Sequence, residues 1–232
     1  MKFLTLVILA LLSTLSHAAC VILLHGLARS PSSMETLQQA LITEGFNTVN
    51  LGYPSRQHGI DELSERAITP ALEQCVADDE VHFVTHSLGG ILVRQYLAKH
   101  KISKLKYVVM LGPPNQGSEV VDKLEAVPGF HFINGDAGLQ LGTGALSVPN
   151  SLGPANFNVG IIAGSASINW ILSALIPGTD DGKVAIERTK LEGMNDHIEM
   201  PVTHPFMMKN DRVIAEVVYY LKQGRFKARS EE

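Results

Sequence analysis

The first half of the chain alternates between short apolar runs and longer segments of helical spacing. The apolar runs cover residues 21–25, 48–51, 81–85 and 105–111, and each has the length of a buried strand. Between them, residues 33–44, 60–75 and 88–100 carry apolar side chains at helical intervals. Strands and helices that alternate in this way predict an α/β fold, with a mostly parallel sheet flanked by helices.

The alternation is interrupted in the second half of the chain. Residues 128–158 are rich in glycine and proline and predict an irregular cap or loop region, of the kind that usually serves a function. Strands are expected again at 159–163 and 197–202, with helices near 183–190 and at 211–221. An apolar insert lies at about 165–179. It fits either a lid beside a functional site or a helix buried in the core.

The N-terminus has the pattern of a secretory signal peptide. Lys2 precedes an apolar run at 3–15, and small residues stand at the −3 and −1 positions of a cleavage point after Ala18. The apolar run is shorter than the roughly 20 residues that a membrane-spanning helix needs. The sequence therefore predicts a signal peptide at 1–18, a single domain at 19–232, and an exported protein that is periplasmic or secreted.

Composition narrows the function classes further. The 232-residue chain is 45% hydrophobic and 18% charged, with a formal net charge of −4, which excludes a disordered chain. No basic run indicates a nucleic-acid partner. Cys20 and Cys75 each precede a predicted strand at the same edge of the sheet, so export would allow them to form a disulfide. Two buried thiols, or a lipid-modified Cys20, are the alternatives.

The most informative motif is Thr85-His86-Ser87-Leu88-Gly89-Gly90, which follows a strand and opens a helix. This context predicts a nucleophile elbow, where a sharp turn raises the Ser87 hydroxyl above the carboxyl edge of the sheet. Such a turn needs small residues on both sides. Gly89 meets this requirement, whereas Thr85 replaces the usual glycine. An ordinary helix cap is the alternative role for the serine.

A serine nucleophile needs a base, which is itself oriented by an acid. His204 directly follows the last predicted strand and is the expected base, in preference to His197 at the start of that strand. The acid should follow the preceding strand. Asp181 is the expected acid, and Asp180 is the alternative.

An oxyanion hole requires two backbone donors near the nucleophile. The N–H of Leu88, directly after Ser87, is the first expected donor. The Leu27 N–H, in the loop after the first strand, is the second. Gly26 and Gly89 would let the backbone segments approach closely at these two places.

Together these motifs resemble the α/β-hydrolase superfamily, and within it the small bacterial lipases and esterases. The resemblance runs from about residue 20 to 221 and is carried by His25-Gly26-Leu27, His86-Ser87-Leu88-Gly89-Gly90, Asp181-Gly182 and His204. It implies an α/β-hydrolase fold in a minimal version that lacks the superfamily's first strands. It also implies acyl transfer through an acyl-enzyme, with no metal and no organic cofactor.

The resulting expectation is a serine carboxylic-ester hydrolase, a lipase or esterase, with a small-molecule or lipid ester as substrate. The apolar insert would allow transient contact with a membrane or lipid surface. Two other classes stay open. One is a different acyl-transfer enzyme, such as a thioesterase, an amidase or a lipid acyltransferase. The other is a non-catalytic module that binds a hydrophobic ligand.

Overall fold

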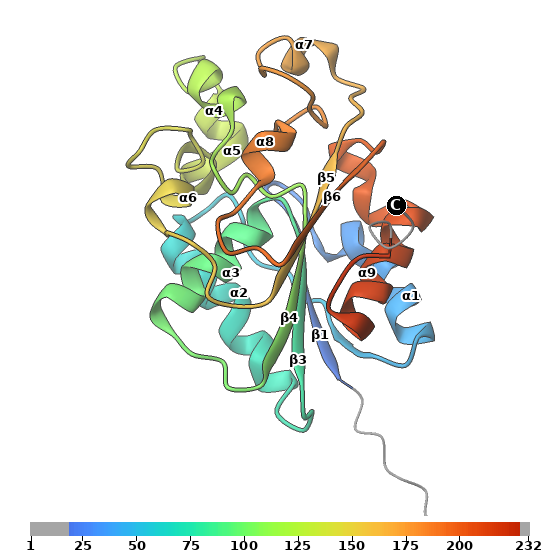
Figure 1. Ribbon diagram of the computed structural model, residues 1–232. Helices are drawn as coiled ribbons and strands as arrows, with labels where there is room; N and C mark the ends of the chain where they lie inside the picture. The colour runs from blue at the N-terminus through green and yellow to red at the C-terminus, as the bar shows by residue number, and fades with distance from the viewer. Residues whose placement is uncertain (1–18, 228–232) are drawn as a thin grey trace, which may run out of the picture.

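A single parallel sheet forms the centre of the computed structural model, which describes residues 19–227 (Figure 1). The strands lie in the order β2-β1-β3-β4-β5-β6, and every neighbouring pair is parallel. Their bounds are β1 Cys20–Leu24, β2 Asn47–Val49, β3 Val81–His86, β4 Leu105–Leu111, β5 Val159–Gly164 and β6 Asp196–Met200. All six strands follow the predicted pattern, and no strand precedes β1 within the described residues. The predicted α/β architecture, with a parallel sheet flanked by helices, is therefore confirmed.

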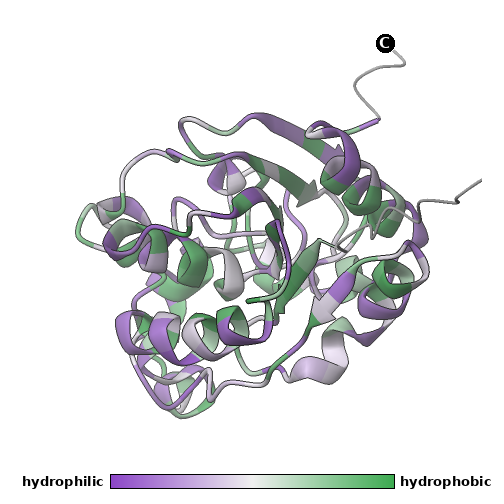
Figure 2. Cartoon of the chain, turned by 90° about the horizontal axis from the view of Figure 1, so that it is seen from below, coloured by the Kyte–Doolittle hydropathy of each residue, from purple (hydrophilic) through white to green (hydrophobic). Residues whose placement is uncertain are grey.

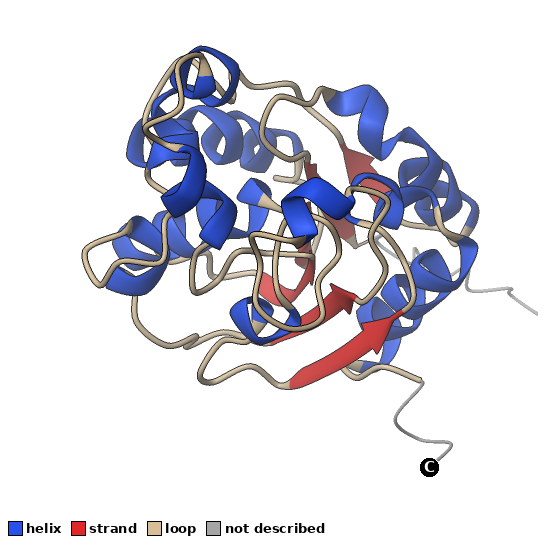
Figure 3. Cartoon of the chain, turned by 90° about the horizontal axis from the view of Figure 1, so that it is seen from above, coloured by secondary structure: helices blue, strands red, loops and turns tan. Residues whose placement is uncertain are grey.

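Helices cover both faces of this sheet (Figures 1 and 3). On one face α2 (Ile60–Gln74) and α3 (Leu88–Lys99) pack against the strands, and on the other face α1 (Glu35–Thr43) and α9 (Asp211–Gln223) do so. Figure 2 shows hydrophobic colour along the strands and on helix surfaces that face them. Strands covered on both faces have no solvent side, which is why they appear in the sequence as continuous apolar runs.

The segment after β4 is more helical than the sequence predicts. It contains α4 (Glu119–Leu124), α5 (Phe130–Leu139) and α6 (Val148–Ser151), of which the last two lie in the stretch expected to be irregular. The glycines there serve short turns. Gly129 begins α5 with φ 91°, and Gly135 interrupts it with φ 63°. Glycine tolerates these angles readily, so a glycine-rich stretch can still hold short helices.

The apolar insert contains one short helix, α7 (Trp170–Ser173), and α8 (Ile186–Thr189) follows it. The Trp170 side chain is 78% exposed and Ile171 is 59% exposed, so the alternative of a helix buried in the core is wrong. Figure 1 shows α7 above the carboxyl ends of the strands. Among residues 19–227, no helix is long and apolar enough to cross a membrane. The predicted signal peptide, 1–18, lies outside the described residues.

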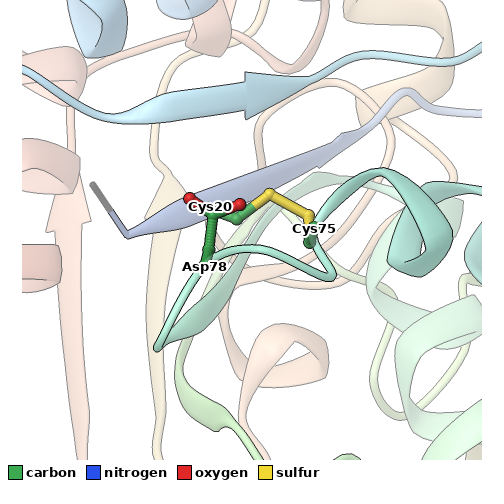
Figure 4. Close-up of side chains that lie close together, drawn as sticks. All are labelled: Cys20, Cys75 and Asp78. Carbon is green, nitrogen blue, oxygen red and sulfur yellow. A yellow bond between two sulfur atoms is a disulfide. The ribbon is translucent and has the colours of Figure 1, made fainter. Parts of the chain in front are cut away.

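A disulfide joins Cys20 to Cys75, as the sequence predicts (Figure 4). Cys20 begins β1 and Cys75 follows α2, and their Cα atoms are 5.7 Å apart. Together with Asp78 they form the one group of side chains in the described chain whose spacing suits a metal ion. Both sulfurs are bonded to each other, however, and the Asp78 carboxylate accepts a hydrogen bond from the Asn47 side chain. The group therefore acts as a structural clamp at the amino end of β1.

Candidate active site

The turn from β3 into α3 places Ser87 in an unusual backbone conformation. Its φ of 53° and ψ of −119° lie in a region that a residue with a side chain rarely adopts. A Cβ atom at Gly89 would lie 2.7 Å from the Leu24 carbonyl oxygen, so only glycine fits there. Thr85 is fully buried, and its hydroxyl lies 3.5 Å from the Val109 carbonyl oxygen. The sheet therefore accommodates threonine where glycine is usual.

The strand order places this turn at a crevice. The chain leaves β1 for β2 on one side and then crosses to β3 on the other. The connections after β1 and β3 therefore diverge, and ligands bind at such a switch point in open α/β sheets. Ser87 follows β3, and Leu27 lies in the loop after β1. Figure 3 looks down on this edge of the sheet, where loops surround the strand ends.

Three of the predicted side chains lie in one hydrogen-bonded chain. His204 Nε2 is 3.0 Å from Ser87 Oγ, and His204 Nδ1 is 2.7 Å from Asp181 Oδ2. The second carboxylate oxygen, Oδ1, accepts the backbone N–H groups of Lys183 and Val184 at 3.0 and 2.9 Å. Asp181 is 1% exposed and His204 is 4% exposed. The carboxylate is thus fixed in its rotation, and it fixes the imidazole with a proton on Nδ1.

The two alternative residues have other partners. Asp180 Oδ1 accepts the Gly182 N–H and the Ser173 hydroxyl, both at 2.7 Å. His197 Nε2 lies 2.9 Å from the Thr189 hydroxyl. Asp180 therefore caps the turn next to Asp181 and connects α7 to this turn. The hydrogen bonds that reach Ser87 come from Asp181 and His204 instead.

The two predicted oxyanion donors have no acceptor within residues 19–227. In this part of the chain, neither the Leu27 N–H nor the Leu88 N–H donates to another group. Leu88 is the first residue of α3, where the N–H groups are unpaired and the helix dipole is positive. A Cβ atom at Gly26 would lie 2.8 Å from His86 Nδ1 and 3.2 Å from the Ser87 Cβ. Gly26 therefore allows the Leu27 loop to lie against the elbow.

Two residues beside these three side chains, His86 and Gly112, received no role of their own from the sequence. His86 is buried, and its Nε2 lies 2.9 Å from the His204 carbonyl oxygen. Burial lowers the pKa of the His86 imidazole well below its ordinary value, and His204 lowers it further. His86 is therefore neutral and donates from Nε2 to that carbonyl. Gly112 has φ 54°, and a Cβ atom there would lie 2.9 Å from Asp181 Oδ2. Its position directly after β4, at the carboxyl edge of the sheet, is the sequence signal for such a role.

Two cavities meet at Ser87. The first, about 160 Å³, is named the polar pocket for its charged and polar side chains, which lie beside apolar ones. Its walls include the catalytic candidates Ser87, Asp181 and His204, the polar residues Arg29, Asn169 and Lys183, and the apolar residues Leu27, Ile168, Leu172 and Pro205. The apolar pocket, about 60 Å³, shares Leu27, Ser87 and Lys183 with it and is otherwise mainly apolar, with walls that include Pro114, Val120, Val121, Phe130 and Leu141. A larger hollow of about 650 Å³ lies at the amino ends of β4 to β6 and contains none of the predicted site residues.

Comparisons with known proteins agree on the fold. No protein-family model matches the chain, and neither does any curated protein sequence. Among solved structures, the mature lipase BlEst2 of Bacillus licheniformis has a TM-score of 0.72 at 16% identity, covering 90% of this chain and 93% of the lipase. The metagenomic carboxyl esterase MGS0156 has a TM-score of 0.62 at 17% identity, covering 82% of this chain and 65% of the esterase. A thermophilic esterase from Thermogutta terrifontis has a TM-score of 0.55 at 11% identity, with 89% and 90% covered. The chain therefore has the α/β-hydrolase fold, in the arrangement of these bacterial lipases and esterases.

Proposed function

We propose that this protein is an exported serine carboxylic-ester hydrolase, a lipase or esterase. The observation that carries the proposal is the hydrogen-bonded chain from Ser87 Oγ through His204 to the buried Asp181, with distances of 3.0 and 2.7 Å. These hydrogen bonds end at Ser87, which has a strained backbone conformation and lies at the crevice of the sheet. A serine hydroxyl becomes nucleophilic when a positioned imidazole accepts its proton.

The reaction follows from this geometry. His204 Nε2 accepts the Ser87 proton while Ser87 Oγ attacks the ester carbonyl carbon, and the carbonyl oxygen becomes an oxyanion held by the Leu27 and Leu88 N–H groups. His204 then donates the proton to the leaving alcohol, and an acyl-enzyme remains. Water attacks this ester with His204 again as the base, which releases a carboxylic acid and restores Ser87. Asp181 keeps the Nδ1 proton in place throughout.

We assign the two halves of an ester to the two pockets that meet at Ser87. The apolar pocket, walled by Val121, Phe130 and Leu141, suits the acyl chain. The polar pocket then receives the alcohol. Around the site, α5, α7 and their loops expose large apolar side chains, which would favour contact with a lipid surface. They include Phe132, Ile133, Leu146, Ile168, Trp170 and Ile171.

Export rests on the N-terminal pattern and on the disulfide. A disulfide persists in oxidising compartments and is rare in the cytosol. The proposal is tested by determining the N-terminal residue of the protein recovered outside the cytoplasm. Ala19 is the expected first residue, and a chain that still begins at Met1 contradicts the signal peptide.

Labelling with a fluorophosphonate probe tests the enzyme class. The wild-type protein is expected to be labelled, Ser87→Ala is expected to lose labelling, and the exposed-site control Ser103→Ala is expected to keep it. Failure to label the wild type would support a binding module instead. Labelling without hydrolysis of nitrophenyl esters would point to a thioesterase, an amidase or an acyltransferase. Removal of the serine typically costs on the order of 10⁴- to 10⁶-fold in rate.

A further inference from the structure

Two positive side chains line the polar pocket without an acidic partner. Arg29 lies in the loop after β1, and Lys183 lies two residues after Asp181. Within residues 19–227, neither side chain forms an ion pair or a hydrogen bond, whereas several other cations pair with carboxylates. Those paired cations include Arg66, Lys99, Lys106, Arg188, Lys190 and Lys222.

No acid of the pocket is available to neutralise them. Among residues 19–227, Asp181 is the one acidic residue that lines this pocket, and its two oxygens are occupied by His204 and by backbone N–H groups. Desolvation by burial lowers the pKa of the Lys183 amine, and the positive charge of Arg29 lowers it further, while Asp181 acts in the opposite direction. Arg29 and Lys183 border the same pocket, so both positive charges act on the space inside it. An anion bound in this pocket would be attracted by both charges.

The position of Lys183 defines where such an anion would lie on a substrate. Lys183 borders both pockets, and so does Ser87, whereas Arg29 borders the polar pocket. An ester with its acyl chain in the apolar pocket leaves its alcohol in the polar pocket, which both cations border. The anionic group would then belong to the alcohol and lie a few bonds from the ester oxygen.

We propose, on the basis of the function proposed above, that the polar pocket selects esters whose alcohol carries a phosphate with net negative charge. The substrate class that combines this alcohol with an apolar acyl chain is the anionic glycerophospholipids. The guanidinium of Arg29 can hold two phosphate oxygens at once, and the Lys183 ammonium supplies a point charge. A zwitterionic headgroup would bring a second cation into a pocket that offers it no acceptor carboxylate.

Kinetics with two short lipids test this selection. Dihexanoyl phosphatidylglycerol and dihexanoyl phosphatidylcholine are used below their micelle concentrations, so that surface binding does not contribute. The kcat/KM value is expected to be at least about tenfold higher for the anionic lipid, which corresponds to one charge-assisted hydrogen bond. Arg29→Gln and Lys183→Gln should each reduce this ratio severalfold, chiefly through KM. The matched controls Arg66→Gln and Lys101→Gln should leave the ratio unchanged.

A binding measurement separates this inference from the function it rests on. Ser87→Ala protein is titrated with each lipid and with inorganic phosphate by calorimetry, so that turnover plays no part. Tighter binding of the anionic lipid to Ser87→Ala, lost in Ser87→Ala/Arg29→Gln, supports the inference. A wild-type protein that binds this lipid but hydrolyses no ester would refute the proposed function and leave the inference standing. Equal binding and equal rates for the two lipids overturn the inference and leave ester hydrolysis intact. Inorganic phosphate that binds as tightly as the lipid overturns the assignment to a lipid ester.

Discussion

Replacement of Asp181 by asparagine should switch the protonation of His204 without removing any atom of the site's framework. The Oδ1 atom accepts two backbone N–H groups, from Lys183 and Val184, while Oδ2 faces His204 Nδ1. Asparagine has one oxygen, which is needed by the two N–H donors. Its NH₂ group therefore turns toward His204 and donates to Nδ1. The imidazole proton then moves to Nε2, which can no longer accept the proton of Ser87.

The expected cost is large because the pair is sealed from solvent. Asp181 is 1% exposed and His204 is 4% exposed, so no solvent water can replace the carboxylate as the acceptor of the His204 Nδ1 proton. A wrong tautomer of this kind costs about 10⁴-fold in kcat, which equals about 5 kcal/mol of transition-state stabilisation. The assay is the kcat of nitrophenyl butyrate hydrolysis, together with the rate of fluorophosphonate labelling. Both should fall, while KM changes little.

Asp180→Asn is the matched control for this substitution. Asp180 Oδ1 accepts the Gly182 N–H and the Ser173 hydroxyl, and an amide oxygen can accept both. Its activity should therefore stay within about threefold of the wild type. Thermal melting of both variants shows whether a loss of activity reflects unfolding. If a folded Asp181→Asn protein kept a tenth of the activity, or if Asp180→Asn lost as much, the assignment of the acid would be refuted.

Three further predictions concern stability and the acyl pocket. Replacing Cys20 and Cys75 by alanine should lower the free energy of unfolding in urea by about 4 kcal/mol, because the bond closes a loop with a sequence separation of 55 residues. Val121→Trp should narrow the apolar pocket and shift the preference among nitrophenyl esters to shorter acyl chains. Burial lowers the pKa of His82 to about 4, so the unfolded chain binds more protons below pH 6.5. The free energy of unfolding should fall by about 3 kcal/mol as the pH falls from 6.5 to 4, and His82→Gln should reduce that fall.

Each of these predictions has an outcome that contradicts it. Equal urea midpoints with and without the disulfide would show that the bond does not restrict the unfolded chain. An unchanged chain-length profile in Val121→Trp would place the acyl chain elsewhere. An undiminished fall in stability at low pH in His82→Gln would assign the titration to other groups, such as the buried His25 and His86, whose pKa values are also lowered chiefly by burial.

The strands and the positions at their ends were predictable because both depend on local sequence. A buried parallel strand is a continuous apolar run, and the residue after it must lie at the carboxyl edge of the sheet. Ser87 and the Leu27 loop follow such runs directly. The choice between Asp180 and Asp181 was not predictable in this way. Both lie in one turn, and the direction of each side chain is set by N–H groups and a hydroxyl that they reach only in the folded chain.

The segments that wall the pockets were harder to predict for a related reason. The apolar residues of α7 have the composition of a core helix, yet Trp170 is exposed. The short helices after β4 are too short to be stable by themselves. The buried guanidinium of Arg94, on α3, donates to the Asn115, Pro149 and Gly153 carbonyl oxygens and so holds the surrounding loops. A contact between residues so far apart leaves no local pattern in the sequence.

The reacting groups and the pocket walls are attached to the sheet in different ways. Ser87 follows its strand directly, Leu27 lies in the loop after β1, and Asp181 is bound through its own turn, so the reacting groups depend on the sheet. The pocket walls instead join this framework through a few side-chain bonds, such as Ser173 to Asp180 and Ser118 to the Lys183 carbonyl. Substrate preference should therefore change by substitution in the walls more readily than the reaction itself changes. The same separation explains why the elbow motif could be found in the sequence while the identity of the alcohol had to be inferred from the folded pocket.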